Sequence, residues 1–196
     1  DDPYYWLRDD ARESADVLGY LRAENAYTDA ALARLRPLED RLYDEIVGRI
    51  RQDDRSVPFR RRGCWYYARY ETGRDYPVHA RRRGDMDAPE EVLLDVNELA
   101  AGRDYYQVGN YVVSQDNRLL AWADDTSGRR QYTIRVRDLD AGTDLADEIP
   151  GTSGAMAWAD DGRTLYYIAN DPQTLLGRWV RRHVLGTPVA QDVVVH

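Results

Sequence analysis

The order of turns and strands repeats along the second part of this sequence, and this repeat limits the possible folds more than any other feature. The tripeptides Asp116-Asn117-Arg118 and Asp161-Gly162-Arg163 each precede a short apolar run, and they lie 45 residues apart. Residues 138–143 and 183–187 close the same two units. A repeat of about 45 residues made of short strands and turns is typical of a β-propeller blade with four antiparallel strands. A β-sandwich, the competing fold, does not explain a repeated unit.

The chain before the repeat has a helical pattern. Ser14 is the expected N-cap of a first helix, and Asp16 lies in its first turn. Pro37 suits the first turn of a second helix, in which leucine or isoleucine recurs every four residues. We therefore expect a mainly β protein with an N-terminal α-helical segment. Residues 1–56 form that segment, and residues 57–196 form the first two to three blades of a propeller. Because propellers close with about four to eight blades, these cannot close a ring alone.

Charge and composition exclude several classes of protein. The net charge is −8, and all 27 basic residues are arginine, so an acidic balance argues against a nucleic-acid partner. We expect the arginine runs at 60–62 and 81–83 to be solvated strand ends that discourage edge pairing, with a nucleic-acid patch as the alternative. No run reaches the ~18 apolar residues of a membrane span. The single cysteine, Cys64, excludes an internal disulfide framework and a cysteine metal cluster.

These features favour a cytoplasmic protein. The chain opens with Asp1 instead of Met, and it closes inside an expected strand. We therefore expect both ends to continue in a longer protein, in which a targeting segment could precede residue 1.

The sequence contains one poor match to a serine-hydrolase nucleophile. Such an enzyme places its serine in a G-x-S-x-G turn between a strand and a helix. Residues 151–155 read Gly-Thr-Ser-Gly-Ala, so Ser153 has the right neighbours on one side only, and no helical pattern follows. We interpret this stretch as a turn before the second repeat unit, and we expect no catalytic residue in the chain.

The remaining titratable residues do not form a recognisable site. His79 and His183 lie in expected strands among arginines, where a histidine is usually at the surface or half-buried. Carboxylates occur as adjacent pairs at strand ends, and adjacent strand residues point to opposite faces, so we expect turn formation. No calcium-loop, zinc or phosphate-binding motif occurs, so we expect no metal and no cofactor.

Paired arginines at a blade turn are the most distinctive local feature. Arg129 and Arg130 lie within the sequence Arg-Arg-Gln-Tyr-Thr-Ile. They are candidates for contact with a substrate or with another domain, because a guanidinium pairs well with an acidic surface. A solvated turn is the alternative.

Several motifs resemble the prolyl oligopeptidase family of serine peptidases, and within it the oligopeptidase B group. They are spread over nearly the whole chain: residues 2–8 (DPYYWLR), 20–27 (YLRAENAY), 45–50 (EIVGRI), 91–97 (EVLLDVN), 104–109 (DYYQVG), 128–133 (GRRQYT) and 171–176 (DPQTLL). Residues 177–183 depart from the family pattern.

The resemblance implies a two-domain enzyme. A seven-bladed propeller would cover an α/β-hydrolase domain that follows it in the chain and carries the catalytic triad, so this chain would be the N-terminal portion only. The enzyme would cleave short peptides after Arg or Lys, and the propeller would control their access. The hydrolase domain and short basic peptides are then the expected partners. A stand-alone propeller module for protein interaction is the alternative. We also expect the isolated chain to self-associate through open sheet edges and exposed apolar surface.

Overall fold

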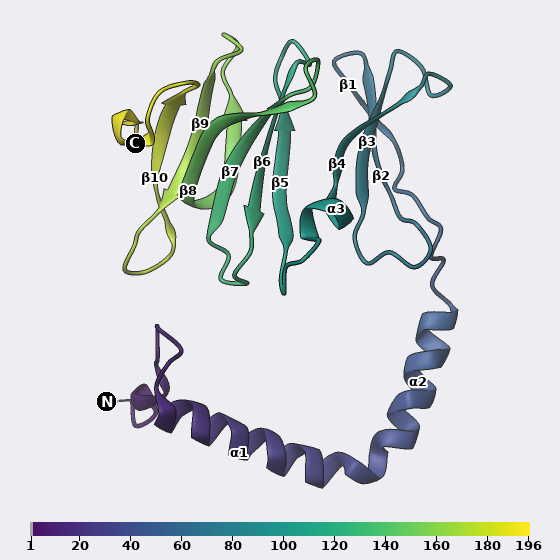
Figure 1. Ribbon diagram of the computed structural model, residues 1–196, viewed down its shortest axis with the longest axis vertical. Helices are drawn as coiled ribbons and strands as arrows, with labels where there is room; N and C mark the ends of the chain where they lie inside the picture. Colours follow the sequence, from purple (N-terminus) through teal and green to yellow (C-terminus); the bar gives the residue numbers. More distant parts are fainter. Residues whose placement is uncertain (1) are drawn as a thin grey trace. The chain divides into compact units, whose positions relative to one another are not determined.

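The structure is a computed structural model that describes residues 2–196. The chain divides into two compact units, one ending at Arg51 and the other beginning at Gln52 (Figure 1).

The first unit is helical. It contains the 3₁₀ turn η1 (Tyr5–Leu7), the helix α1 (Ala15–Leu32), the 3₁₀ turn η2 (Ala33–Leu35) and the helix α2 (Arg36–Gly48). Ser14 caps α1, because its side-chain oxygen accepts a hydrogen bond from the backbone N–H of Val17. Pro37 lies in the first turn of α2, where its missing N–H costs no hydrogen bond. Both expected helix starts are confirmed.

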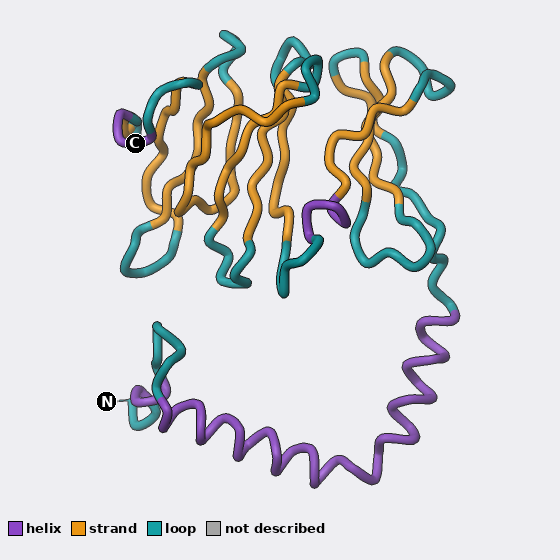
Figure 2. Tube along the Cα trace, viewed as in Figure 1, coloured by secondary structure: helices purple, strands orange, loops and turns teal. Residues whose placement is uncertain are grey.

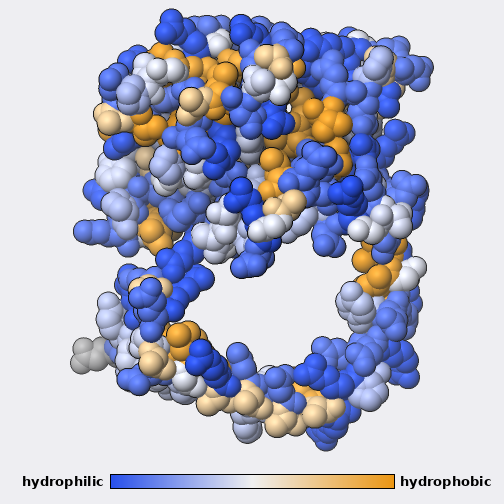
Figure 3. Space-filling model, viewed as in Figure 1, coloured by the Kyte–Doolittle hydropathy of each residue, from blue (hydrophilic) through white to orange (hydrophobic). Residues whose placement is uncertain are grey.

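The helices of this unit carry an apolar stripe that the unit does not cover. Leu42 and Ile46 of α2 keep 46% and 59% of their surface exposed, whereas Val17 of α1 is buried. Orange patches along both helices mark the stripe in Figure 3. Helices with an exposed apolar stripe gain most of their stability from packing against another element.

The second unit is built from eleven antiparallel strands in two sheets (Figures 1 and 2). The strands are β1 (Phe59–Arg61), β2 (Cys64–Arg69), β3 (Val78–Arg83), β4 (Glu90–Asp95), β5 (Gln107–Val113), β6 (Leu119–Asp125), β7 (Tyr132–Asp138), β8 (Thr143–Trp158), β9 (Thr164–Asn170), β10 (Gly177–Val184) and β11 (Val193–Val194). The short helix α3 (Val96–Ala100) and the 3₁₀ turn η3 (Val189–Gln191) join strands. The sequence reading expected only strands and turns here.

The eleven strands form three four-stranded blades. Blade 1 is β1 to β4, a sheet of its own. Blade 2 is β5, β6, β7 and the first part of β8, and blade 3 is the second part of β8 with β9, β10 and β11. The two blades share one sheet because β8 pairs with β7 through residues 143–152 and with β9 through residues 152–158. The expected four-stranded antiparallel blades are present.

Two apolar clusters hold neighbouring blades together. Strand β6 contributes to both, because its side chains alternate between its two faces. Leu120 and Trp122 pack towards blade 1 with Leu93, and Ala121 and Ala123 pack towards blade 3. Each blade is therefore a layer that is buried against the next one.

The two hairpins that marked the repeat have the expected geometry. Asn117 in the β5–β6 turn and Gly162 in the β8–β9 turn adopt positive φ angles of 65° and 65°. Asp161 accepts hydrogen bonds from the backbone N–H groups of Arg163 and Thr164, so the 45-residue spacing reports equivalent turns of successive blades.

Candidate functional site

Ser153 lies in strand β8, in a place that does not make it a nucleophile. Its hydroxyl accepts a hydrogen bond from the backbone N–H of Ala155, at 3.3 Å. No histidine among residues 2–196 forms a hydrogen bond with a serine, so the described part of the chain contains no serine–histidine pair. The expectation that the chain carries no catalytic residue stays a prediction.

The interpretation of residues 151–155 as a turn is wrong. They lie within β8, at the point where it passes from blade 2 to blade 3 and its pairing register with β9 shifts between Thr152 and Met156. Gly151 and Gly154 adopt positive φ angles of 67° and 83°, which only glycine reaches without strain. The glycines therefore let one strand bend between two blades.

His183 lies in a different environment from the one expected. Its side chain is fully buried in strand β10, between two carboxylates. Its Nε2 lies 3.0 Å from Oδ1 of Asp147, and its Nδ1 lies 2.7 Å from Oδ1 of Asp192. Asp147 also accepts from the backbone N–H of Gly186, and Asp192 accepts from the hydroxyl of Tyr167. The cluster joins β8, β9, β10 and the end of blade 3, which indicates a structural role.

The adjacent carboxylates Asp124 and Asp125 have different hydrogen-bond partners. Asp124 accepts from the hydroxyl of Tyr106 at 2.9 Å and pairs with Arg135 at 3.1 Å. Burial raises the pKa of Tyr106, and the neighbouring Asp124 carboxylate adds to this. Asp125 accepts backbone hydrogen bonds from the turn that follows it, including that of Arg130. The carboxylates of Asp124 and Asp125 point to opposite faces of the strand, so they do not share one reactive centre.

Arg129 and Arg130 lie in the turn between β6 and β7. Both are exposed, and Arg130 adopts a positive φ of 58°. Asp125 fixes the turn by accepting the backbone N–H of Arg130 at 2.7 Å, and Ser127 accepts that of Arg129. The turn carries two cationic side chains at the surface, and their role in contact with a substrate or another domain stays a prediction.

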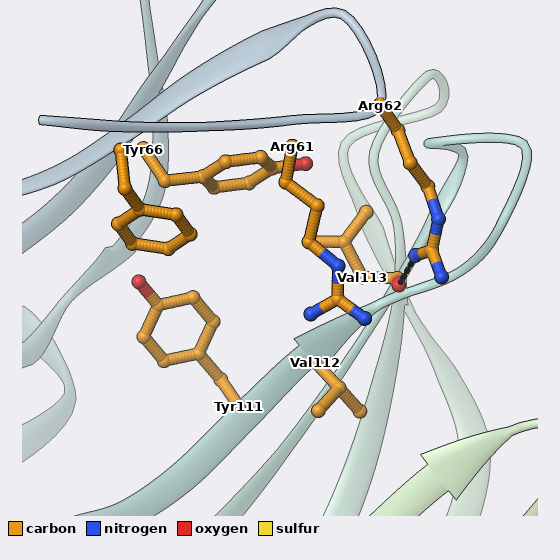
Figure 4. Close-up of a pocket in the computed structure, with 7 residues that line it drawn as sticks. Arg61, Arg62, Tyr66, Tyr111, Val112 and Val113 are labelled. Atoms are coloured by element: carbon orange, nitrogen blue, oxygen red, sulfur yellow. Dashed lines mark hydrogen bonds between the residues drawn. The ribbon is translucent and has the colours of Figure 1, made fainter.

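A pocket in the propeller unit lies between blades 1 and 2 (Figure 4). We call it the wedge pocket. It encloses about 230 Å³ between β1, β2 and β5. Its lining residues are Phe59, Arg61, Arg62, Tyr66, Tyr111, Val112 and Val113.

Aromatic rings form one side of the wedge pocket and arginines the other. The rings of Phe59 and Tyr66 are stacked, with centroids 5.5 Å apart. Arg62 donates from Nη1 to the carbonyl oxygen of Val113 at 3.2 Å, and this bond joins the two blades. In Figure 4 the guanidinium of Arg61 points into the space beside Tyr111. The arginine run at 60–62 is visible in the sequence, but the pocket is not, because its other wall comes from β5, which lies about 50 residues further along the chain.

The wedge pocket has hydrogen-bond donors but no carboxylate. Burial raises the pKa of the Tyr111 hydroxyl, which therefore stays protonated at neutral pH. No group of three or more histidine, cysteine or carboxylate side chains that could hold a metal ion occurs in the described residues, and none of these residue types lines the pocket. No helix of the described chain is long and apolar enough to cross a membrane.

The whole chain is similar to the N-terminal parts of known peptidases. The family described as "Prolyl oligopeptidase, N-terminal beta-propeller domain" matches residues 1–196. Dipeptidyl aminopeptidase BI of Pseudoxanthomonas mexicana is 60% identical over 211 residues, and the match covers 100% of this chain and 29% of that protein. Protease 2 of Moraxella lacunata is 33% identical over 203 residues, with the same coverage of 100% and 29%.

A solved structure has the same fold. The structure of oligopeptidase B from Leishmania major superimposes with a TM-score of 0.92 at 34% identity, over 98% of this chain and 28% of that one. The expected propeller fold is therefore confirmed. The chain spans less than a third of the length of each of these relatives.

Proposed function

Because the chain belongs to the prolyl oligopeptidase family and matches its N-terminal β-propeller domain, we propose that it is the non-catalytic, access-controlling part of a larger serine peptidase that cleaves short peptides after Arg or Lys. The observation that carries this proposal is the match of the family over residues 1–196, without a nucleophile in the described residues. In this proposal residues 1–56 form a helical segment, residues 57–196 form the first blades, and the protein works in the cytoplasm.

An open face on blade 3 supports the presence of a further blade. Tyr166 and Ile168 of β9 occupy the positions that Ala121 and Ala123 occupy in β6, 45 residues earlier. Both alanines are fully buried by blade 3, whereas Tyr166 and Ile168 are only half-buried. A shallow apolar hollow of about 280 Å³ lies on this face, lined in part by Ile168. The next blade covers one face of blade 1 and one face of blade 2. A fourth blade would bury the corresponding apolar face of blade 3 in the same way.

The apolar stripe of the helical unit supports a second domain as partner. Exposed Leu38, Leu42 and Ile46 follow one another at intervals of four residues on α2. Their burial would contribute ~1.5–3 kcal/mol per fully covered side chain. We assign this surface to the hydrolase domain of the same protein.

The 60% identity to a protein named dipeptidyl aminopeptidase supports a second specificity, removal of dipeptides from free amino termini. A test uses the full-length protein with two forms of one short peptide, Gly-Arg-Ala-Ala with a free or an acetylated amino terminus. An endopeptidase that cleaves after Arg hydrolyses both, whereas a dipeptidyl aminopeptidase hydrolyses only the free form.

Access control is tested with substrates of different size. The full-length protein should hydrolyse a short Arg-containing peptide and leave the same sequence intact when it is a surface loop of a folded protein. Equal rates on the two substrates would contradict access control, and no turnover of any peptide would contradict the proposed peptidase. The stand-alone module would then be favoured.

A further inference from the structure

The wedge pocket lies where blades 1 and 2 meet, beside a hydrogen bond that joins them. Each blade begins with one strand, and these first strands approach each other closely between blades 2 and 3. There Asn110 donates to the carbonyl of Gly154 at 3.2 Å, and the indole N–H of Trp158 donates to the carbonyl of Val112 at 3.1 Å. Between blades 1 and 2, Arg62 donates to Val113, and the space beside that bond remains open as the pocket.

Arg61 is the unusual group in this pocket. Arg81 and Arg83, on another strand of the same blade, share the carboxylate of Glu91 at 2.7 and 2.6 Å. The guanidinium of Arg61 forms no hydrogen bond or ion pair with any side chain among residues 2–196, although the chain carries 35 acidic residues. It points into the pocket instead of towards a carboxylate (Figure 4). Arg61 is exposed, so its guanidinium donors are open to an anion from outside, and they lie beside the apolar wall of the pocket.

The rest of the lining selects the kind of anion. Phe59, Tyr66, Tyr111 and two valines present rings and methyl groups beside the guanidinium. At about 230 Å³ the pocket is smaller than the ~300–1,000 Å³ of a site for a whole small molecule, so it accepts one residue. An inorganic anion would leave the apolar wall unused, whereas a terminal amino acid with an apolar side chain uses both parts.

We propose that the wedge pocket binds the C-terminal residue of a peptide, with Arg61 pairing the terminal carboxylate and the rings of Phe59, Tyr66 and Tyr111 packing against an apolar last side chain. The Tyr111 hydroxyl, which forms no hydrogen bond with another described residue, is a second donor. The inference rests on the proposed function, since a peptidase must admit peptides to its propeller, and it adds a preference for peptides with a free, apolar C-terminus.

The test measures binding and does not depend on cleavage. The probe is Gly-Ala-Gly-Ala-Gly-Phe, labelled with fluorescein at its amino terminus and free of Arg and Lys. It is prepared with a carboxylate or an amide at its C-terminus, and its binding to the full-length protein is followed by fluorescence anisotropy. A charge-assisted hydrogen bond at this partly exposed site predicts about tenfold tighter binding of the acid form.

Two matched variants locate the effect. Arg61→Gln should remove the preference for the acid form and leave binding of the amide form unchanged. Arg60→Gln makes the same change of charge on the neighbouring residue of β1, which does not line the pocket, and should keep the preference. Unchanged preference in Arg61→Gln would overturn the proposal. Equal loss in both variants would overturn it too, because it would show only a long-range effect of charge.

Two further measurements distinguish this proposal from its alternatives. Displacement of the acid peptide by millimolar inorganic phosphate would mean that the pocket takes a free anion, and it would overturn the assignment to a peptide. Turnover of a short Arg-containing peptide is measured on the same samples. If turnover is absent while the Arg61-dependent preference persists, the proposed peptidase fails and the peptide-binding pocket stands; the reverse result refutes the pocket alone.

Discussion

Replacement of His183 by leucine tests the polar cluster that joins the blade 2 part of β8 to the strands of blade 3. The side chains of Asp147 and Asp192 keep only 6% and 1% of their surface exposed, and the imidazole lies between them. Each ring nitrogen therefore lies within hydrogen-bond distance of one buried carboxylate oxygen. Leucine leaves two buried carboxylates with one remaining partner each, Gly186 for Asp147 and Tyr167 for Asp192.

The expected loss is large. Leaving a buried hydrogen-bonding group without its partner costs ~1–3 kcal/mol, and more for a carboxylate, so the loss of both contacts corresponds to about two to four orders of magnitude in the opening equilibrium. Hydrogen exchange of the backbone amides of β9 and β10 in the full-length protein measures this opening. In His183→Leu these amides should exchange at least about a hundredfold faster, whereas amides of blade 1 should be unaffected.

A control and a rescue complete this test. His79→Leu removes the other strand histidine, whose pKa burial lowers and which packs beside the ring of Tyr111 without a carboxylate, so blade 3 should not respond. Adding Asp147→Asn and Asp192→Asn to His183→Leu removes the buried charges and should recover part of the loss. A change of less than tenfold in β9 and β10 on His183→Leu would refute the reasoning.

Three other predictions follow from single features. The backbone N–H of Thr174 and the guanidinium of Arg178 lower the pKa of Asp171 to about 2. An unfolded aspartate titrates near 3.9, so the difference in melting temperature between wild type and Asp171→Asn should be constant above pH ~5 and be lost as the pH falls through ~2. A difference independent of pH contradicts this. Gly109→Ala places a Cβ 2.3 Å from the Tyr132 ring and should cost ~1–3 kcal/mol in chemical denaturation, whereas Gly19→Ala in α1, with open space around it, should stabilise. The isolated chain should self-associate at micromolar concentration in sedimentation velocity, and a monodisperse monomer would count against this.

The features that the sequence predicts correctly depend on residues close together in the chain. Ser14, Pro37 and the turn at Asp161 are predictable because a cap, a first-turn proline and a turn aspartate act on residues within four positions. The helix α3 has the same kind of signal, since Asp95 caps it by accepting from the N–H groups of Asn97 and Glu98, but the strand pattern around it hid that signal.

Contacts between distant parts of the chain explain what the sequence reading missed. No residue near His183 in the sequence predicts its contact with Asp147, which lies 36 residues earlier on β8. The sequence of the shared strand β8 resembles that of a turn because glycine is common in turns. The wedge pocket likewise depends on β1 meeting β5, so the run of arginines at 60–62 could be seen while the missing partner of Arg61 could not.

Labelling with a fluorophosphonate, a reagent that reacts with activated serines, tests the central claim most directly. The full-length protein is treated and digested, and the modified serine is located by mass spectrometry. The account predicts one labelled serine outside residues 1–196 and none within them, because Ser153 bonds to the backbone of Ala155 and has no histidine partner among the described residues. Labelling of Ser153, or of any other serine in this chain, would contradict the assignment of the chain as the non-catalytic part of a serine peptidase.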